Sequence, residues 1–109
     1  MANAYKVLGQ IAPSANTDTT LYTVPASTQA VVSTIVVANR TDSESLYRIA
    51  VRPAGATIAN EHYLAFNVEV AASDSLSLTL GITLDATDVI TVRSNSANLT
   101  FNVFGSEIS

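Results

Sequence analysis

The chain carries few residues able to perform catalysis, and His62 comes first among them because it is the single histidine. A catalytic histidine pairs with a nucleophile and is oriented by a carboxylate. The sequence contains no cysteine and no G-x-S-x-G motif. We therefore expect no catalytic residue, and we expect His62 to cap a loop or to line a subunit interface.

The carboxylates that come nearest to forming an oxygen-ligand cation site are those of Asp85 and Asp88, with Asp74 as a further candidate. Calcium loops usually combine three or more carboxylates with a glycine at the sharp turn. The sequence LDATD lacks that spacing. Asx-turn hydrogen bonds ahead of the next strand are the better interpretation of Asp85 and Asp88. We predict no metal site and no cofactor.

Glycoside cleavage by two carboxylates would need a cleft lined with aromatic rings. The chain has four Tyr, three Phe and no Trp. Most of them fall on strand faces that we expect to be buried, which favours core packing over a carbohydrate-stacking surface. Two N-x-[ST] sequences, at 39–41 and 98–100, match the glycosylation sequon. Because we expect no signal peptide, we interpret both as chance matches.

The charges are few and do not form a patch. Five Lys and Arg side chains stand against nine Asp and Glu, a formal net charge of −4. Nucleic-acid binding normally depends on a basic patch, so no nucleic-acid partner is expected. Arg48 and Arg52 can share one strand face as solvated or interface-pairing arginines. No stretch approaches the 18 apolar residues of a membrane span, so no membrane partner is expected.

The composition favours an assembly. Only 13% of the residues are charged, whereas 48% are hydrophobic. A small domain with so few charges is weakly protected against association through its strand edges. Either the fold covers these edges or the protein belongs to an assembly. We favour the assembly, with further copies of the same chain as partners.

The apolar pattern predicts a single all-β domain over residues 1–109. Turns rich in Pro, Gly, Asn, Asp and Ser separate short runs of β-branched residues, which is typical of an antiparallel β-sandwich, jelly-roll-like in its strand spacing. Residues 40–44 are expected to form an exposed hairpin loop. Residues 56–60 form a helical turn or a loop, and residues 82–84 continue the preceding strand or form a short connection. We predict about eight strands, at residues 4–11, 20–24, 28–39, 46–52, 62–70, 75–80, 89–93 and 99–104.

The longest β-branched run, residues 28–39, is predicted to be the central strand. Strict alternation places Val31, Ile35 and Val37 on one face and Val32 on the other. Apolar residues on both faces indicate that the strand is covered on both sides, or packs on the core with one face and on a partner with the other.

The first strand, within residues 1–11, is expected to be an N-terminal arm or an edge strand. Its alternation places Tyr5 and Val7 on the same face. Arms and edge strands are common contacts between subunits, because their backbone groups are free to pair. The residues that we select as a candidate interface are Tyr5, Val7, Val31, Ile35, Val37, Arg48 and Arg52.

Residues 21–40, LYTVPASTQAVVSTIVVANR, resemble an element of small virion proteins of tailed bacteriophages, including proteins carried by cyanophages. The segments YRIAVRP (47–53), LGITLDATDVITV (80–92) and FNVFGSEI (101–108) fit the same pattern, so the resemblance covers nearly the whole chain. The resemblance implies a β-sandwich structural component of the virion, with no active-site residues and therefore no enzyme.

Two roles follow from this resemblance. The first is a capsid decoration, or cement, protein that stabilises the head exterior, forms a homotrimer or another homo-oligomer and contacts the major capsid protein. The alternative is a tail component, a fibre, collar or baseplate protein, that contacts other tail proteins and host-surface glycans. Both imply synthesis in the host cytoplasm and a final location in the virion.

Overall fold

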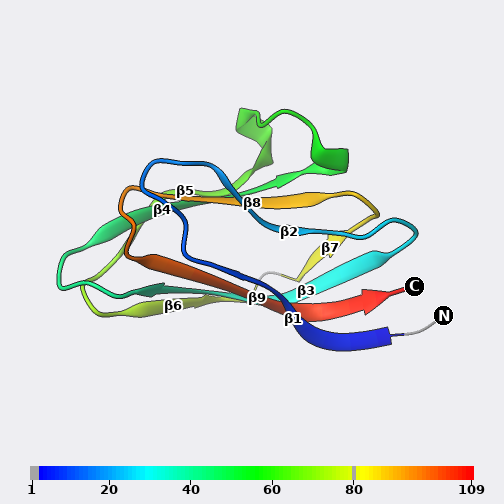
Figure 1. The fold of residues 1–109 in the computed structure, drawn as a ribbon, viewed down its shortest axis with the longest axis horizontal. Coiled ribbons are helices and arrows are strands. Elements are labelled where there is room, and N and C mark those ends of the chain that lie inside the picture. The colour runs from blue at the N-terminus through cyan, green and yellow to red at the C-terminus, as the bar shows by residue number, and fades with distance from the viewer. Residues whose placement is uncertain (1–2, 80) are drawn as a thin grey trace.

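The structure, a computed structural model, describes residues 3–79 and 81–109. Within these residues the chain folds into nine strands that form two antiparallel sheets, packed face to face (Figure 1). The molecule measures 45 × 27 × 19 Å along its principal axes. The prediction of an antiparallel β-sandwich is therefore confirmed.

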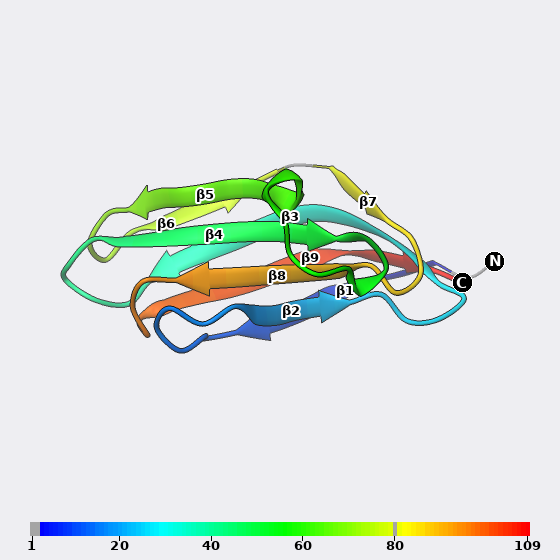
Figure 2. The same ribbon diagram turned by 90° about the horizontal axis from the view of Figure 1, so that it is seen from above.

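The strand order of each sheet places neighbours in space that are distant in sequence. Figure 2 shows the two sheets one in front of the other. In the first sheet the order is β1 (Asn3–Ile11), β9 (Leu99–Ile108), β3 (Gln29–Asn39) and β6 (Ser75–Leu78), with β7 (Ile82–Leu84) also paired to β3. In the second sheet the order is β2 (Thr19–Thr23), β8 (Val89–Ser94), β4 (Ser45–Arg52) and β5 (Tyr63–Val70).

The connectivity is that of a jelly roll. β6 pairs with the second half of β3 and β7 with the first half, so the two are parts of one interrupted strand. Counted as one, they give eight strands in the double Greek-key order of that fold. Residues 82–84, left open by the sequence pattern, thus continue the preceding strand. Leu80, which we expected in that strand, lies outside the described residues.

Most predicted strand ends agree with the structure within one or two residues. The last strand is longer than predicted, because β9 stays paired with both β1 and β3 as far as Ile108. Residues 40–44 do not form a hairpin loop, because they join β3 and β4, which lie in different sheets. Residues 56–60 lead from η1 (Pro53–Gly55) to η2 (Asn60–His62) mostly as a loop.

The core lies between the inner faces of the two sheets. Tyr47 of β4 packs edge-on against Phe101 of β9, with ring centroids 6.2 Å apart. Tyr47 and Ile49 of β4, and Leu99, Phe101 and Val103 of β9, are all buried. The remaining core residues are Leu21, Tyr22, Val24, Ala30, Val32, Ile35, Val37, Val70, Leu84, Ile90 and Val92.

A β-bulge in β3 changes which of its side chains face the core. The pairing of β3 with β9 shifts between Val32 and Thr34, so Ser33 is an extra residue. Val32 and Ile35 are therefore both buried, although they are three positions apart. The predicted alternation, which placed Val31 on the same face as Ile35, is wrong for this reason.

Candidate interaction surface

The outer face of the first sheet presents apolar side chains from three adjacent strands, exposed on β1 and β3 and half-buried at Phe104 of β9. Ser106 of β9 lies between Tyr5 of β1 and Val31 of β3, and Phe104 lies beside Val7. Cross-strand partners project from the same face of a sheet. Tyr5 is 83% exposed, Val7 47% and Val31 37%. These residues form one continuous surface across β1, β9 and β3.

This surface contains an open groove of about 610 Å³. Aromatic and branched aliphatic side chains dominate it, and Lys6 is its single charged residue. A substrate pocket is usually more enclosed and carries convergent polar groups, whereas an open apolar area of this kind is typical of a protein contact. The lining residues are Tyr5, Lys6, Val7, Val31, Ser33, Phe104, Gly105 and Ser106.

The groove exists because β1 and β3 are bulged on either side of a regular β9. In β1 the register shifts between Val7 and Gly9, at the level of the Ser33 bulge in β3. The Ser33 hydroxyl donates to the Phe104 carbonyl over 3.2 Å, which fixes the bulge. A Cβ at Gly105 would lie 2.1 Å from the Val31 carbonyl oxygen, so only glycine permits this close approach.

The structure brings together three of the seven predicted interface residues, namely Tyr5, Val7 and Val31. Ile35 and Val37 do not join them, because both are fully buried in the core. Their assignment to an interface is therefore corrected: the Ser33 bulge turns them inward, where a partner cannot contact their side chains. Residues 3–11 form an edge strand rather than a free arm, since β1 pairs with β9 along its length.

Arg48 and Arg52 lie on β4, in the other sheet. The Arg52 guanidinium donates to the Thr91 hydroxyl at 3.0 Å and to the carbonyls of Gly55 and Ala56 at 3.3 and 3.1 Å. Arg52 thus holds the loop that follows β4. The two arginines do not form one surface with Tyr5, Val7 and Val31.

A hydrogen-bonded network borders the groove. Lys6 of β1 pairs with Glu107 of β9 at 2.7 Å, and the Tyr22 hydroxyl of β2 donates to Glu107 at 2.5 Å. The bonds from Lys6 and Tyr22 hold the pKa of Glu107 below its usual value. Burial, reinforced by the bond to the Glu107 carboxylate, raises the pKa of Tyr22. This network links the two sheets beside the groove.

Phe104 is the residue of this surface that sequence reasoning missed. Its signal lies in the last strand, where it alternates with the inward residues Phe101 and Val103 and must therefore point outward. A second apolar area was also not selected from the sequence. It lies on the edge strand β5, where Leu64 is 49%, Phe66 53% and Val68 36% exposed.

The residues considered for chemistry make structural contacts. His62 Nδ1 accepts a hydrogen bond from the Ala59 backbone at 3.1 Å, which confirms its predicted role as a loop cap. Asp88 accepts from the backbone amides of Ala54 and Asp85, and Asp85 accepts from that of Ala86. Both carboxylates thus bind backbone amides at turns, but none of these bonds reaches the amide two residues onward, as the predicted Asx turns would require. In residues 3–79 and 81–109, no group of three or more His, Cys, Asp and Glu is placed to hold a metal ion.

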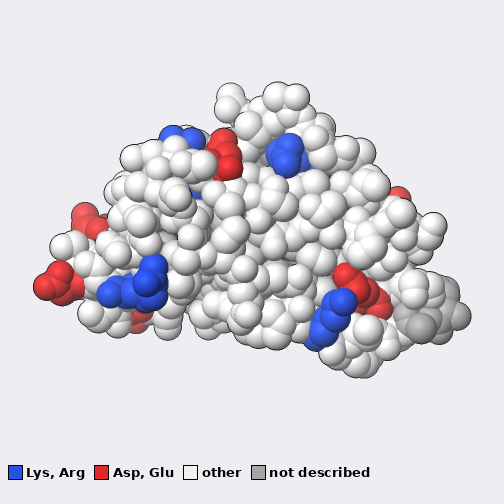
Figure 3. Space-filling view, viewed as in Figure 1, with Lys and Arg blue, Asp and Glu red and all other residues white. Residues whose placement is uncertain are grey.

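A comparison with protein-family models found no match, and a comparison with curated protein sequences found no similar protein. Among the described residues, no helix has the length and apolar character needed to cross a membrane. On the face drawn in Figure 3, charged side chains are few and are separated by wide uncharged areas. The interaction surface is therefore the feature on which a function can be argued.

Proposed function

We propose that the protein is a structural subunit of a tailed-phage particle that decorates the exterior of the capsid and is not an enzyme. The observation that carries this proposal is the exposed apolar groove across β1, β9 and β3. Removing apolar surface from water contributes about 25 cal/mol per Å², so an exposed groove of this kind favours assembly.

The edge strand β1 extends this contact. A stable interface uses roughly 20–30 residues on each side, whereas eight residues line the groove. The contact must therefore continue beyond the groove. β1, which forms one side of the groove, is the edge strand of its sheet. Its outward backbone groups allow a neighbouring subunit to add a strand. A homotrimer, or another ring of copies seated on the major capsid protein, would cover both features.

The sequence resemblance to small phage virion proteins supports the same role. The jelly-roll connectivity agrees with it, because viral capsid proteins use this fold, although lectins and cupins use it too. The tail role remains the alternative, since a fibre, collar or baseplate subunit would use the same surface.

The test is binding of the purified protein to expanded capsids assembled without it, measured by co-sedimentation. Val7→Glu introduces a charge at the groove and should abolish binding. Leu64→Glu is the matched control, because Leu64 is 49% exposed and Val7 47%, each on an edge strand. Leu64→Glu should bind like the wild type.

Copy number in the purified virion separates the two roles. Hundreds of copies per particle would support the capsid role, whereas a dozen or fewer would replace it with the tail role. Absence of the protein from virions would overturn both. Failure of the wild-type protein to bind capsids would overturn the decoration role, and a loss of binding in Leu64→Glu alone would overturn the choice of surface.

A further inference from the structure

The outer face of the second sheet carries two positive charges directly opposite each other. Arg48 of β4 and Arg93 of β8 are cross-strand partners in the antiparallel register. The sequence has only five Lys and Arg in all. Like charges at such positions repel each other and destabilise the strand pair. A chain with so few cations thus places two of them where they disfavour folding.

Neighbouring groups hold the two guanidinium groups in place without neutralising both. Arg48 Nε donates to the Asn67 side-chain oxygen at 2.9 Å, and the guanidinium carbon lies 4.0 Å from the centre of the Phe66 ring. Arg93 Nη1 lies 3.4 Å from the Asp18 carboxylate. Among the described residues, Arg48 has no carboxylate within ion-pair distance.

Arg52, on the same strand, shows the contrast. Three protein groups accept hydrogen bonds from its guanidinium group, so Arg52 makes structural contacts within the protein. Arg48 and Arg93 are instead each held by a single acceptor, so most of their N–H groups remain available. Each guanidinium has five N–H donors, arranged in a fork that fits carboxylate and phosphate groups.

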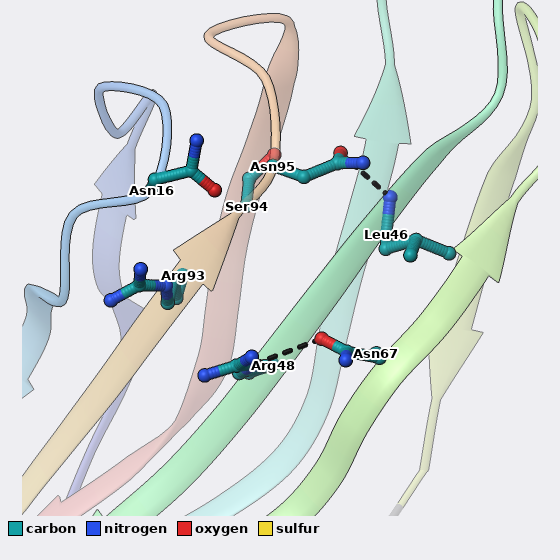
Figure 4. A pocket seen from close by; sticks show the side chains of 7 residues that line it. All are labelled: Asn16, Leu46, Arg48, Asn67, Arg93, Ser94 and Asn95. Carbon is teal, nitrogen blue, oxygen red and sulfur yellow. Dashed lines mark hydrogen bonds between the residues drawn. The ribbon is translucent and has the colours of Figure 1, made fainter.

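Both arginines line a pocket of about 200 Å³ (Figure 4). Asn67 stands beside Arg48, and Asn95 and Asn16 approach from two loops. The Asn95 side-chain oxygen accepts from the Leu46 amide at 2.9 Å, as the Asn67 oxygen accepts from Arg48. The amide oxygens of Asn67 and Asn95 are thus occupied, whereas neither of their NH₂ groups has an acceptor among the described residues. The pocket therefore offers mainly hydrogen-bond donors.

We propose that this pocket binds an acidic sugar residue, with its anionic group, a carboxylate or a phosphate, between Arg48 and Arg93. An anion there would relieve the repulsion between the two guanidinium groups and accept their free N–H donors. The amides of Asn67 and Asn95 would donate to the sugar hydroxyls. The pocket is smaller than the roughly 300–1,000 Å³ of sites for drug-sized ligands, which fits one sugar residue.

This inference does not rest on the proposed function, because the pocket and the apolar groove lie on opposite sheets. The experiment is a titration of the ¹⁵N-labelled full chain, followed by ¹H–¹⁵N spectra. The probes are galacturonic acid for the carboxylate, glucose 1-phosphate for the phosphate, and neutral galactose and glucose as controls. We expect saturable shifts at Asn67, Arg93 and Asn95 with an acidic sugar, and none with the neutral sugars.

The variants Arg48→Gln and Arg93→Gln should each weaken binding at least tenfold. Arg40→Gln is the matched control, since it removes the same charge from an arginine that donates to the Ala97 carbonyl and does not line the pocket. The amide spectrum of each free variant shows whether it has folded. Arg48→Lys keeps the positive charge but loses the forked arrangement of N–H donors. Its affinity should lie between those of the wild type and Arg48→Gln, which provides a second test.

The two acidic probes identify the anionic group, and saturable binding of either one supports the proposal. Failure of both to bind at millimolar concentrations would overturn it. Equal binding by the neutral sugars, or an equal loss of affinity in Arg40→Gln, would also overturn it, because either result would show that the arginine pair is not the site.

Discussion

Glu107 is the residue through which three strands are joined. Its carboxylate accepts from Lys6 of β1 and from Tyr22 of β2, while its backbone belongs to β9. The Glu107 side chain is 14% exposed and that of Lys6 is 50% exposed, so solvent screens the ion pair more than the bond to Tyr22. The hydrogen bond between the sheets is therefore the more important of the two for stability.

This network predicts a pH dependence of stability. Because the bonds lower the folded-state pKa of Glu107, they stabilise the fold above the usual glutamate pKa of about 4.3. This contribution is lost as the pH falls through the lowered value. Glu107→Gln should lower the free energy of unfolding by about 1 kcal/mol at neutral pH. Urea unfolding at several pH values should show the two proteins converging in acid, and a constant difference would contradict the prediction.

Thr87 occupies a conformation that β-branched residues disfavour. Its φ is 68°, in the left-handed region, within the turn that Asp85 and Asp88 close. Such a conformation costs a non-glycine residue about 1–2 kcal/mol. Thr87→Gly should therefore raise the free energy of unfolding by about 0.5–1 kcal/mol, after allowance for the greater chain entropy of glycine. Thermal unfolding measures the change.

Thr83→Gly provides a control of opposite sign, because Thr83 lies in strand β7, where glycine is disfavoured. This variant should unfold at a lower temperature than the wild type. A stabilising effect of both substitutions, or of neither, would show that the strain at Thr87 is not the cause.

At the level of elements, the bulges in β1 and β3 determine which apolar residues of these two strands are buried. β9 is regular, and its neighbours β1 and β3 each carry one extra residue at the same level. The bulge in β3 brings its backbone so close to β9 that Gly105 has no room for a Cβ. Gly105 thus permits the bulge that turns Val31 outward and Ile35 inward.

Gly105→Ala should lower the free energy of unfolding by roughly 1–3 kcal/mol, because the new methyl group would overlap the Val31 carbonyl. Ser106→Ala, one residue further along β9, adds no atoms and should change it by less than about 0.5 kcal/mol. Chemical denaturation distinguishes the two. An equal effect of both variants would mean that the close approach is relaxed easily.

The bulges also mark the limit of what the sequence could predict. Strand positions were predictable, because runs such as residues 28–39 are β-branched and are bounded by Pro, Gly and Asn turns. The placement of Val31 and Ile35 on opposite faces of β3 was not predictable, because a bulge depends on pairing with β9, some 70 residues away. The pairing of Arg48 with Arg93 could not be predicted from the sequence either, since the two residues become neighbours only through the sheet register.

On the scale of the whole molecule, the two sheets present surfaces of different chemistry. The outer face of one carries the apolar groove, and that of the other carries the pocket between Arg48 and Arg93. Effects at sites this far apart, without shared contacts, are usually additive. The two surfaces should therefore act independently.

Cross-tests of the variants check this independence. Val7→Glu should leave the affinity for an acidic sugar unchanged, and Arg48→Gln should leave capsid binding unchanged. Both assays on both proteins, and on the double variant, provide the comparison. Loss of both properties in a single variant would show that the surfaces are coupled or that the variant is misfolded, and the amide spectrum tells these apart.

The position of β9 has a consequence for the order in which the fold can form during synthesis. β9 follows every other strand in the sequence, yet it lies inside its sheet, between β1 and β3. A nascent chain that has reached Asn98 lacks the core residues Leu99, Phe101 and Val103. β1 then has no strand to pair with in its sheet, so we expect a chain ending at Asn98 to show no cooperative unfolding transition. Folding of the first sheet must therefore wait until β9 has been synthesised, and the groove across β1, β9 and β3 can form only after that.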